Sequence, residues 1–289
     1  MQAFLINIWK FYHHVRKKMF SVCVEISSKE EPCLPVHWFA LPLQDNMLHR
    51  EIGVYLNKFR LLLDHTNSQV EPRSLKFNKN IYGKPEVEWQ DVDGSHIPPL
   101  HFNISHTSSM IACGVTVNSA IGIDVEEKQR KLKNNILAFA RRYFSPYEVG
   151  LLTAISDPEF QHQEFIKLWT LKEAYVKALG RGFSAAPFKT FTIRFRTATG
   201  GHLSEHRDSE AFDVVVDSFD DPKNLTSNWQ FALIELAGSH YAAVCIEGDR
   251  TTEGNGTRPM KLTVRRTIPF VEDECVSGTD AVVAIVGLT

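Results

Sequence analysis

One long helical segment, standing between two groups of strand-like runs, is the feature that most constrains the fold of this chain. Residues 158–179 place apolar side chains three or four positions apart, which is the spacing of a helix with one buried face. The stretch SDPE at 156–159 supplies a helix start with Pro at the first helical position, and Gly180 and Gly182 supply the stop. The expected buried face consists of Phe165, Leu168, Trp169, Val176 and Leu179.

Strand-like runs occur on both sides of this segment. Before it, we expect a strand over 100–105 and a β-hairpin made of 110–117 and 121–127. After it, we expect strands over 191–196, 212–219, 229–236 and 241–247, the last two joined by the turn AGSH. Shorter helices are expected over 49–65, over 133–142 and from the capping-box pattern SPYE at 145–148. Hairpins and helices in separate blocks predict the α+β class.

Composition excludes several classes of protein. With 289 residues, of which 43% are hydrophobic, the chain can bury one large core or two smaller ones. A net charge of -2 gives no electrostatic argument for a nucleic-acid partner. The five cysteines form neither a CxxC pair nor a Cys/His cluster, so a disulfide framework and a zinc site are not indicated and a reducing compartment is expected. No apolar run approaches the roughly 20 residues that span a bilayer, so we expect a soluble protein without a membrane partner.

The first 24 residues are the only segment that resembles a targeting signal. They contain Lys10, Arg16, Lys17 and Lys18, and no acidic residue precedes Glu25. Their apolar part comes before their basic part, which is the wrong order for a secretory signal. A surface helix of a cytosolic protein is the favoured interpretation, and import into mitochondria is the alternative.

Two acidic residues share one face of an expected strand. Asp124 and Glu126 are two positions apart, so both carboxylates project to the same side while Val125 points to the other. If Glu173 of the long helix approaches them, three carboxylates form an oxygen cage suited to Mg²⁺. A solvated strand end is the alternative, and residue types alone favour it.

The long helix also carries a charged pair on one face. Glu173 and Lys177 are one turn apart, so they can form an ordinary surface ion pair, worth about 0.3 kcal/mol or somewhat more. Lys172 points roughly 100° around the helix from Glu173 and belongs to a different face. In isolation, the ordinary ion pair is the favoured interpretation.

Two further stretches contain residues that can contact phosphate. In FNISH, Ser105 and His106 lie where the strand over 100–105 ends, and such a junction can hold a phosphate. In YGKP, Lys84 lies in a tight turn from which its ammonium group could reach a phosphate. The alternative for FNISH is a capped turn with a hydrogen-bonded histidine. The alternative for YGKP is a lysine that is merely solvated.

The order and spacing of four motifs resemble a known family. YGKP, FNISH, GIDVE and W-x-x-KE-x-x-x-K are similar to the motifs of the 4'-phosphopantetheinyl transferase superfamily, in its larger, monomeric branch that activates peptide synthetases and in its plant and other eukaryotic members. The resemblance covers about residues 70–190 and extends more loosely to about 275. It implies a fold of two similar α/β halves related by a pseudo-twofold, with coenzyme A between them.

The resemblance also implies domain boundaries. They are an N-terminal half over 1–118, in which 1–45 are atypical, a C-terminal half over 119–248 with the metal site, and a linker and tail over 249–289. The tail is expected either to add an edge strand or to be poorly ordered. The family's arginine-containing helix, which binds the 3'-phosphate of coenzyme A, corresponds here to 55–69, which offers only Lys58 and Arg60.

The implied activity is that of a holo-[acyl-carrier-protein] synthase. Members of the family transfer 4'-phosphopantetheine from coenzyme A to a serine of an apo carrier protein, release 3',5'-ADP and require Mg²⁺. Carrier proteins of fatty acid synthesis and the aminoadipate reductase of lysine metabolism are both substrates in the wider family. A catalytically impaired paralogue that only binds coenzyme A or a carrier protein is the alternative.

The resemblance assigns roles to individual residues. The implied metal ligands are Asp124, Glu126 and Glu173. Glu173 and Lys177 are the implied catalytic residues, the first as the base for the serine and the second as a phosphate contact. The implied contacts to coenzyme A are Lys84, Ser105, His106, Lys172 and Lys177. A docking patch for the acidic carrier protein is expected around Arg141, Arg142 and Arg181.

Overall fold

The computed structural model describes most of the chain between residues 76 and 286. The described residues are 20–27, 76–88, 99–117, 119–132, 135–197, 212–218, 229–248, 260–268 and 272–286. The helix expected over 49–65, with Lys58 and Arg60, lies outside them. None of the helices in the described ranges is long and apolar enough to cross a membrane.

A first sheet collects strands from both ends of the chain. Its members are β1 (Phe20–Ser27), β4 (Leu100–His106), β5 (Met110–Val117), β11 (Lys261–Ile268) and β12 (Glu272–Cys275), in the order β12-β11-β1-β5-β4. All neighbours are antiparallel except β1 and β5, which run parallel. Strand β1 therefore lies inside the sheet, where its apolar Val24 is buried.

The second sheet is antiparallel throughout. It contains β6 (Ile121–Glu127), β9 (Trp229–Leu236), β10 (His240–Glu247) and β13 (Val282–Val286), in the order β13-β9-β10-β6. Two separate ribbons join β2 (Lys76–Lys79) with β3 (Pro85–Glu88) and β7 (Phe191–Thr197) with β8 (Phe212–Ser218). The expected β9–β10 hairpin is confirmed.

The sequence signals predicted where two of the helices begin, whereas one helix begins three residues later than expected and one short helix was not predicted. α3 (Ile136–Tyr143), α4 (Pro146–Ala154), α5 (Pro158–Leu179) and α6 (Gly182–Ala185) follow one another, and a 3-10 turn (Phe188–Thr190) precedes β7. The capping box at Ser145 and Glu148 is present, and Asp157 caps the start of α5. Gly180 ends α5 with a left-handed φ of 66°, a conformation that glycine adopts without strain.

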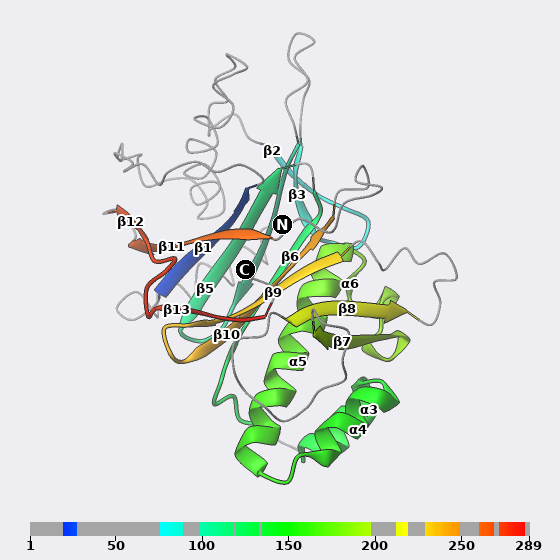
Figure 1. Ribbon diagram of the computed structural model, residues 1–289. Helices are drawn as coiled ribbons and strands as arrows, with labels where there is room; N and C mark the ends of the chain where they lie inside the picture. Colours follow the sequence, from blue (N-terminus) through cyan, green and yellow to red (C-terminus); the bar gives the residue numbers. More distant parts are fainter. Residues whose placement is uncertain are drawn as a thin grey trace.

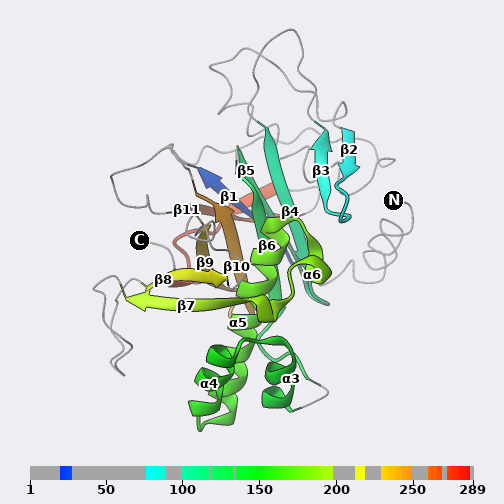
Figure 2. The same ribbon diagram turned by 90° about the vertical axis from the view of Figure 1, so that its right-hand side faces the viewer.

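The second sheet lies between two hydrophobic cores. One core joins it to the first sheet, through side chains such as Val24, Met110 and Val264 against Ile123 and Val244. The other core joins its opposite face to α5, α3, α4 and the β7–β8 ribbon. Figures 1 and 2 show α5 running along the second sheet, with α3 and α4 gathered near its start. The α+β class is confirmed by this arrangement.

The approach of α5 to β6 depends on one glycine. A Cβ atom at Gly122 would lie 2.0 Å from the Ala174 carbonyl oxygen and 2.3 Å from the Ala178 nitrogen. The backbones of helix and strand are thus in direct contact at this residue. Residues 124 and 126 follow on the same face of the strand, so their side chains also point toward α5.

Three expectations about the chain's organisation need correction. Strands 110–117 and 121–127 form as predicted but make no hairpin, because β5 pairs with β4 and β1 whereas β6 pairs with β10. The stretch 20–24, expected to belong to a helical or targeting segment, is part of β1. The tail adds edge strands, as one of the two expectations had it, but it also supplies β11, which lies inside the first sheet between β12 and β1.

The pseudo-twofold stays a prediction. In the described residues all four α-helices lie between 136 and 185, which places them in the expected C-terminal half.

Candidate functional site

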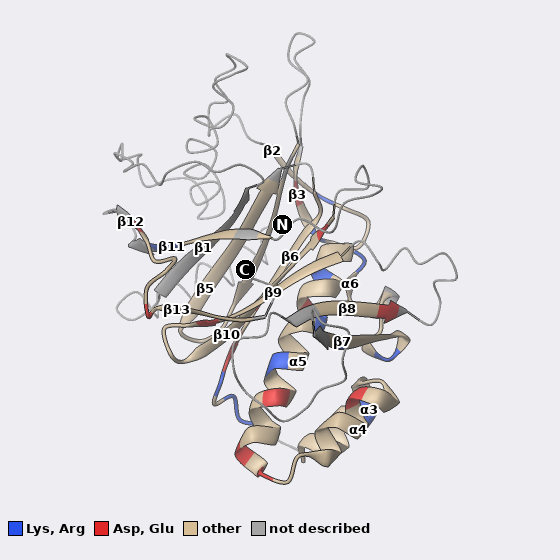
Figure 3. Cartoon of the chain, viewed as in Figure 1, with Lys and Arg blue, Asp and Glu red and all other residues tan. Residues whose placement is uncertain are grey.

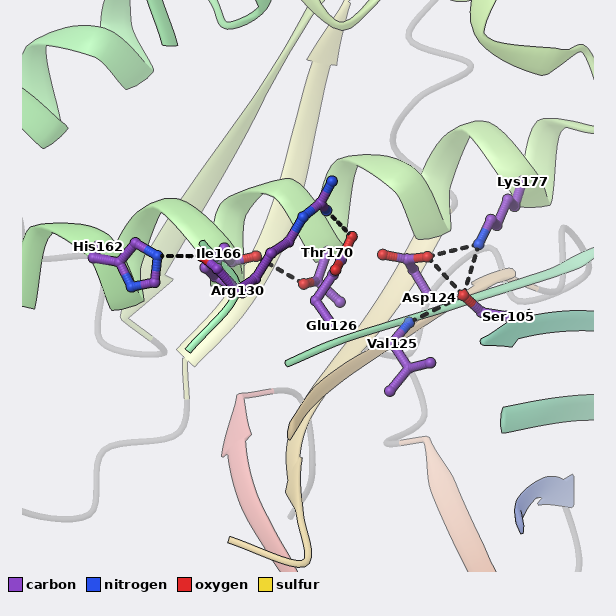
Figure 4. A network of polar contacts seen from close by, with 9 residues as sticks. All are labelled: Ser105, Asp124, Val125, Glu126, Arg130, His162, Ile166, Thr170 and Lys177. Atoms are coloured by element: carbon purple, nitrogen blue, oxygen red, sulfur yellow. Dashed lines mark hydrogen bonds and ion pairs between the residues drawn. The ribbon is translucent and has the colours of Figure 1, made fainter. Parts of the chain in front are cut away.

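Asp124 is the meeting point of three elements. Its Oδ1 accepts hydrogen bonds from Lys177 Nζ of α5 at 2.6 Å and from Ser105 Oγ of β4 at 2.8 Å. Lys177 Nζ also lies 3.0 Å from Ser105 Oγ, which closes a triangle of polar contacts (Figure 4). Three of the residues implicated by the motifs FNISH, GIDVE and KE-x-x-x-K are therefore brought together.

Side chains of β4 hold β6 in place at the site. Strand β6 is an edge of its sheet, and its outward N–H groups need partners. Asn103 Oδ1 accepts from the Ile123 nitrogen at 3.0 Å, and Ser105 Oγ accepts from the Val125 nitrogen at 3.3 Å. The alternation of Asn and Ser in FNIS thus serves the β6 backbone, while Ser105 also contacts Asp124.

Glu126 lies next to Asp124 on the face that points to α5. Its Oε1 is paired with the Arg130 guanidinium, as Figure 4 shows. Burial and the neighbouring charge of Asp124 raise the pKa of Glu126 to about 7, against the opposing effects of Arg130 and Lys177. Arg130 was not singled out from the sequence, and the only signal for it was a basic residue four positions after Glu126.

Glu173 belongs to the same cluster of charges. Burial and the charge of Asp124 raise its pKa, and Lys177 and Arg130 act against that rise. Lys177 makes its close ion pair with Asp124 rather than with Glu173. The two charged residues one turn apart are therefore not a self-contained surface pair. Figure 3 shows bands of both charge signs along α5.

The carboxylates of Asp124, Glu126 and Glu173 are chemically suited to a hard divalent cation, but they are not arranged around a common point. Asp124 is 4% exposed, and its buried Oδ2 has no hydrogen-bond partner among the described residues. Carboxylate oxygens are the ligands that Mg²⁺ prefers. As the side chains stand, no group of three or more His, Cys, Asp or Glu in the described ranges is close enough to hold a metal. The magnesium ligands Asp124, Glu126 and Glu173 stay a prediction.

Lys84 reaches the same strand from the β2–β3 turn. Its Nζ donates to the Ile121 carbonyl oxygen at 2.9 Å, and burial lowers the pKa of Lys84. Asn80 of the same turn donates to the Gly180 carbonyl oxygen at 2.9 Å and so contacts the end of α5. Asn80 was not among the residues predicted from the sequence. The Lys84 ammonium group therefore contacts the first residue of β6, whereas Asp124 lies three residues further along that strand.

Lys172 is not positioned to bind coenzyme A, which corrects the role that the motif implied. Its side chain is fully buried, and its Nζ lies 2.7 Å from Glu148 Oε1 and 2.8 Å from the Phe191 carbonyl oxygen. The ammonium group also lies 4.1 Å from the centre of the Phe191 ring. Burial lowers the pKa of Lys172 to about 8, against the opposing effect of Glu148. Its ion pair joins α5 to α4 and β7.

The remaining predicted residues lie on the surface. His106 is the last residue of β4, and its side chain is exposed. Arg141, Arg142 and Arg181 are also exposed. The rings of Tyr143 and Phe183 are 6.0 Å apart, which brings the end of α3 next to α6, and Phe183 is 41% exposed. The expected combination of basic and apolar groups therefore exists at this place, and its docking role stays a prediction.

A second polar cluster ties the β4–β5 turn to the second sheet. Ser239 Oγ lies 2.8 Å from His240 Nδ1, and His240 Nε2 lies 3.0 Å from Ser109 Oγ and 3.2 Å from Thr107 Oγ1. Ser109 donates its hydroxyl proton to Glu127 at 2.9 Å, so it accepts from His240. Burial lowers the pKa of His240 and so favours the neutral ring, against the opposing charge of Glu127.

Comparison with known proteins adds to this geometry. Residues 120–245 match the sequence profile of the 4'-phosphopantetheinyl transferase superfamily. A 4'-phosphopantetheinyl transferase of Bacillus subtilis is 36% identical over 135 residues, which are 47% of this chain and 53% of that protein. The transferase Sfp of Bacillus subtilis strain 168 is 34% identical over 126 residues, 44% of this chain and 50% of Sfp. HetI of a Nostoc species is 35% identical over 115 residues, 40% of this chain and 46% of HetI.

The extent of these matches limits what they cover. The chain spans about half the length of the curated relatives that it matches. The matched segment includes β6, α5 and β10, and with them Asp124, Glu126, Glu173 and Lys177. Over residues 120–245 the chain is therefore similar to the 4'-phosphopantetheinyl transferase superfamily.

Proposed function

We propose that the protein transfers 4'-phosphopantetheine from coenzyme A to a serine hydroxyl of an apo carrier protein and releases 3',5'-ADP. The observation that carries the proposal is the convergence of Lys177, Ser105 and Asp124 at one point, within a segment of the transferase superfamily. In this reaction the serine oxygen forms a bond to the β-phosphorus, and the bond from that phosphorus to the oxygen of 3',5'-ADP breaks. The serine proton is lost to a base.

Each of the convergent side chains has a part in this reaction. Lys177 is 26% exposed, so its ammonium group can exchange Asp124 for a phosphate oxygen and stabilise charge on the leaving group. Ser105 can donate its hydroxyl to the same phosphate. Glu173 accepts the serine proton, directly or through water. Lys84 adds positive charge near the start of β6.

A divalent cation, with Mg²⁺ as the proposed ion, would be held by Asp124, Glu126 and Glu173 and would neutralise charge on the pyrophosphate. The support for it is the unpartnered Oδ2 of Asp124 and the oxygen-only donor set. Lys177 of α5 donates to the Asp124 carboxylate and would then contact the pyrophosphate from the side of that helix.

The finer assignments rest on the sequence. Acyl carrier protein is the proposed acceptor, which makes the protein a holo-[acyl-carrier-protein] synthase of fatty acid metabolism, with the carrier domain of aminoadipate reductase as the alternative acceptor. The exposed arginines Arg141, Arg142 and Arg181 support docking of an acidic partner. We propose that the protein acts as a monomer in the cytosol.

The test is transfer of a fluorescent coenzyme A analogue to apo acyl carrier protein in the presence of Mg²⁺. Glu173→Gln and Asp124→Ala should each lower the labelling rate about 100-fold or more, because each removes charge at the reacting phosphate. Glu164→Gln is the matched control on the same helix, since that carboxylate pairs with Lys167 at 2.6 Å, and it should label normally. Full labelling by either site variant would contradict the assigned roles.

The unmodified chain separates the transferase from a protein that only binds. A binding paralogue would form a complex with coenzyme A or the carrier protein and leave no covalent product. Mass spectrometry of a panel of apo carrier proteins would also identify the acceptor.

A further inference from the structure

Asp124, Glu126 and Glu173 form an acidic cluster. Arg130 contacts this cluster, and the transferase reaction leaves it without a role. It follows β6, and its guanidinium returns to pair with Glu126 Oε1 (Figure 4). Lys177 pairs with Asp124 in the same way. Asp124 and Glu126, the two β6 carboxylates that point to α5, therefore each have their own positive side chain.

The position of Arg130 is fixed by contacts to three other residues. Its backbone nitrogen donates to the Glu127 carbonyl oxygen at 3.0 Å, and its own carbonyl oxygen lies 2.9 Å from His162 Nε2 on α5. The guanidinium carbon lies 5.7 Å from the centre of the Trp169 ring, which supports the planar group from one side. The arginine is thus held between α5 and Glu126 rather than free in solvent.

Its partner is also more enclosed than that of an ordinary surface pair. Glu126 is 16% exposed, whereas Arg130 is 41% exposed. Ion pairs gain strength as one partner loses contact with water, because screening is weaker there. The pair therefore contributes to the charge balance of the cluster when no metal is present.

A divalent cation and the guanidinium compete for the negative charge of the Glu126 carboxylate. The three acidic side chains are not gathered into a cage in the described structure. Glu126 must move to join the other two carboxylates around a cation, and its ion pair with Arg130 opposes that movement. The positive charge of Arg130 also repels an approaching cation.

We propose that Arg130 is an internal counter-ion that competes with the divalent cation for Glu126 and thereby lowers the affinity of the acidic cluster for metal. The inference rests on the metal assignment of the proposed function. It assigns Arg130 to the control of metal binding, and not to contact with the reacting atoms. Since Arg130 is more exposed than Glu126, it has room to swing outward when the cation binds.

The test measures metal affinity without coenzyme A or a carrier protein. Mn²⁺ alone is titrated into the full chain, and the free ion is followed by its electron paramagnetic resonance signal. Loss of an ion pair of this kind predicts that Arg130→Gln binds Mn²⁺ about three- to tenfold more tightly than the wild-type chain. Arg130→Lys keeps the charge but not the guanidinium that lies against Trp169, so its affinity should fall between those of the wild-type chain and Arg130→Gln.

Lys128→Gln is the matched control. It removes the same charge two residues away, but its partner Glu235, at 2.5 Å, lies on β9. If Lys128→Gln raises the Mn²⁺ affinity as much as Arg130→Gln does, the affinity depends only on net charge and the role of Arg130 is overturned. Circular dichroism and urea unfolding of each variant show that it is folded before its affinity is compared.

The remaining outcomes separate the inference from the proposed function. If the wild-type chain binds Mn²⁺ and Arg130→Gln binds it no more tightly, the competition is refuted and the transferase proposal stands. If neither chain binds Mn²⁺ and Asp124→Asn changes nothing, the metal assignment is refuted together with the competition. Tighter binding by Arg130→Gln that is lost in Arg130→Gln/Asp124→Asn supports the inference.

Discussion

Two lysines of α5 show how much a residue's role depends on its partners. Lys172 is buried in an ion pair with Glu148, 24 positions earlier, while Lys177 contacts Asp124, 53 positions earlier. Both lie in one motif, and both were candidates for binding coenzyme A. Helix geometry separates their faces but cannot say which face is interior. The structure assigns the first lysine to the core and the second to the site.

At this scale we predict that Lys172→Met destabilises the protein by about 3–5 kcal/mol, because Glu148 would remain as a buried charge without its cation. Urea unfolding would measure the loss. Glu148 also accepts from the backbone nitrogens of Ser145 and Ile193 at 2.8 Å, so it cannot easily turn to solvent. Adding Glu148→Gln removes the charge and should restore part of the stability. A Lys172→Met chain as stable as wild type would show that the pair is dispensable.

Among the secondary-structure elements, β6 and α5 form the scaffold of the site. Their backbones touch at Gly122, and this contact determines how near Asp124 lies to Lys177. The sequence placed both elements correctly, from periodicity and capping signals. It did not reveal that the glycine of GIDVE is needed for close packing, because that requirement comes from Ala174 and Ala178 of α5.

We expect Gly122→Ala to lower the free energy of unfolding by about 2–4 kcal/mol, since the added methyl group meets backbone atoms that can move only with the whole helix. Metal affinity and labelling should fall as well, because α5 carries Glu173 and Lys177. Gly150→Ala in α4 is the control: its Cβ would meet nothing within 4 Å, and it should stabilise the protein by about 0.5–1 kcal/mol. Equal effects of the two changes on urea unfolding would contradict the close contact.

For the molecule as a whole, the last strands of the chain complete both sheets. Strand β11 pairs with β1, and β13 pairs with β9. Met260, Val264 and Val276 are buried in the core between the sheets. Residues 260–268 and 272–286 therefore belong to the same folding unit as residues 20–27 and 229–236.

Removing residues 260–289 should unfold the protein or leave it marginally stable. Each buried apolar side chain contributes about 1.5–3 kcal/mol, and three of them approach the total stability of about 5–15 kcal/mol of a typical domain. Limited proteolysis and urea unfolding would detect the change. A chain ending at residue 281 keeps β11 and β12 and should lose less. If the chain that lacks residues 260–289 unfolds at the same urea concentration as the full chain, the tail is not part of the core.

The sequence alone determined the elements whose signals are local. The start and stop of α5, the capping box of α4 and the bounds of β9 follow from side chains that act within a few residues of one another. Through resemblance to a family, three of the motifs also named Ser105, Asp124 and Lys177 as site residues, and the structure brings their side chains into contact.

Only the tertiary structure decided the partners. Residues 118–120 between β5 and β6 favoured a hairpin, yet the strands enter different sheets, because β4 side chains and β10 satisfy the two edges of β6. Contacts between elements also decide the ion pairs of Lys172 and Arg130. They likewise place β1 and β11 side by side in one sheet. Propensity and periodicity describe a residue's neighbours along the chain, whereas burial and charge pairing depend on groups that folding brings together.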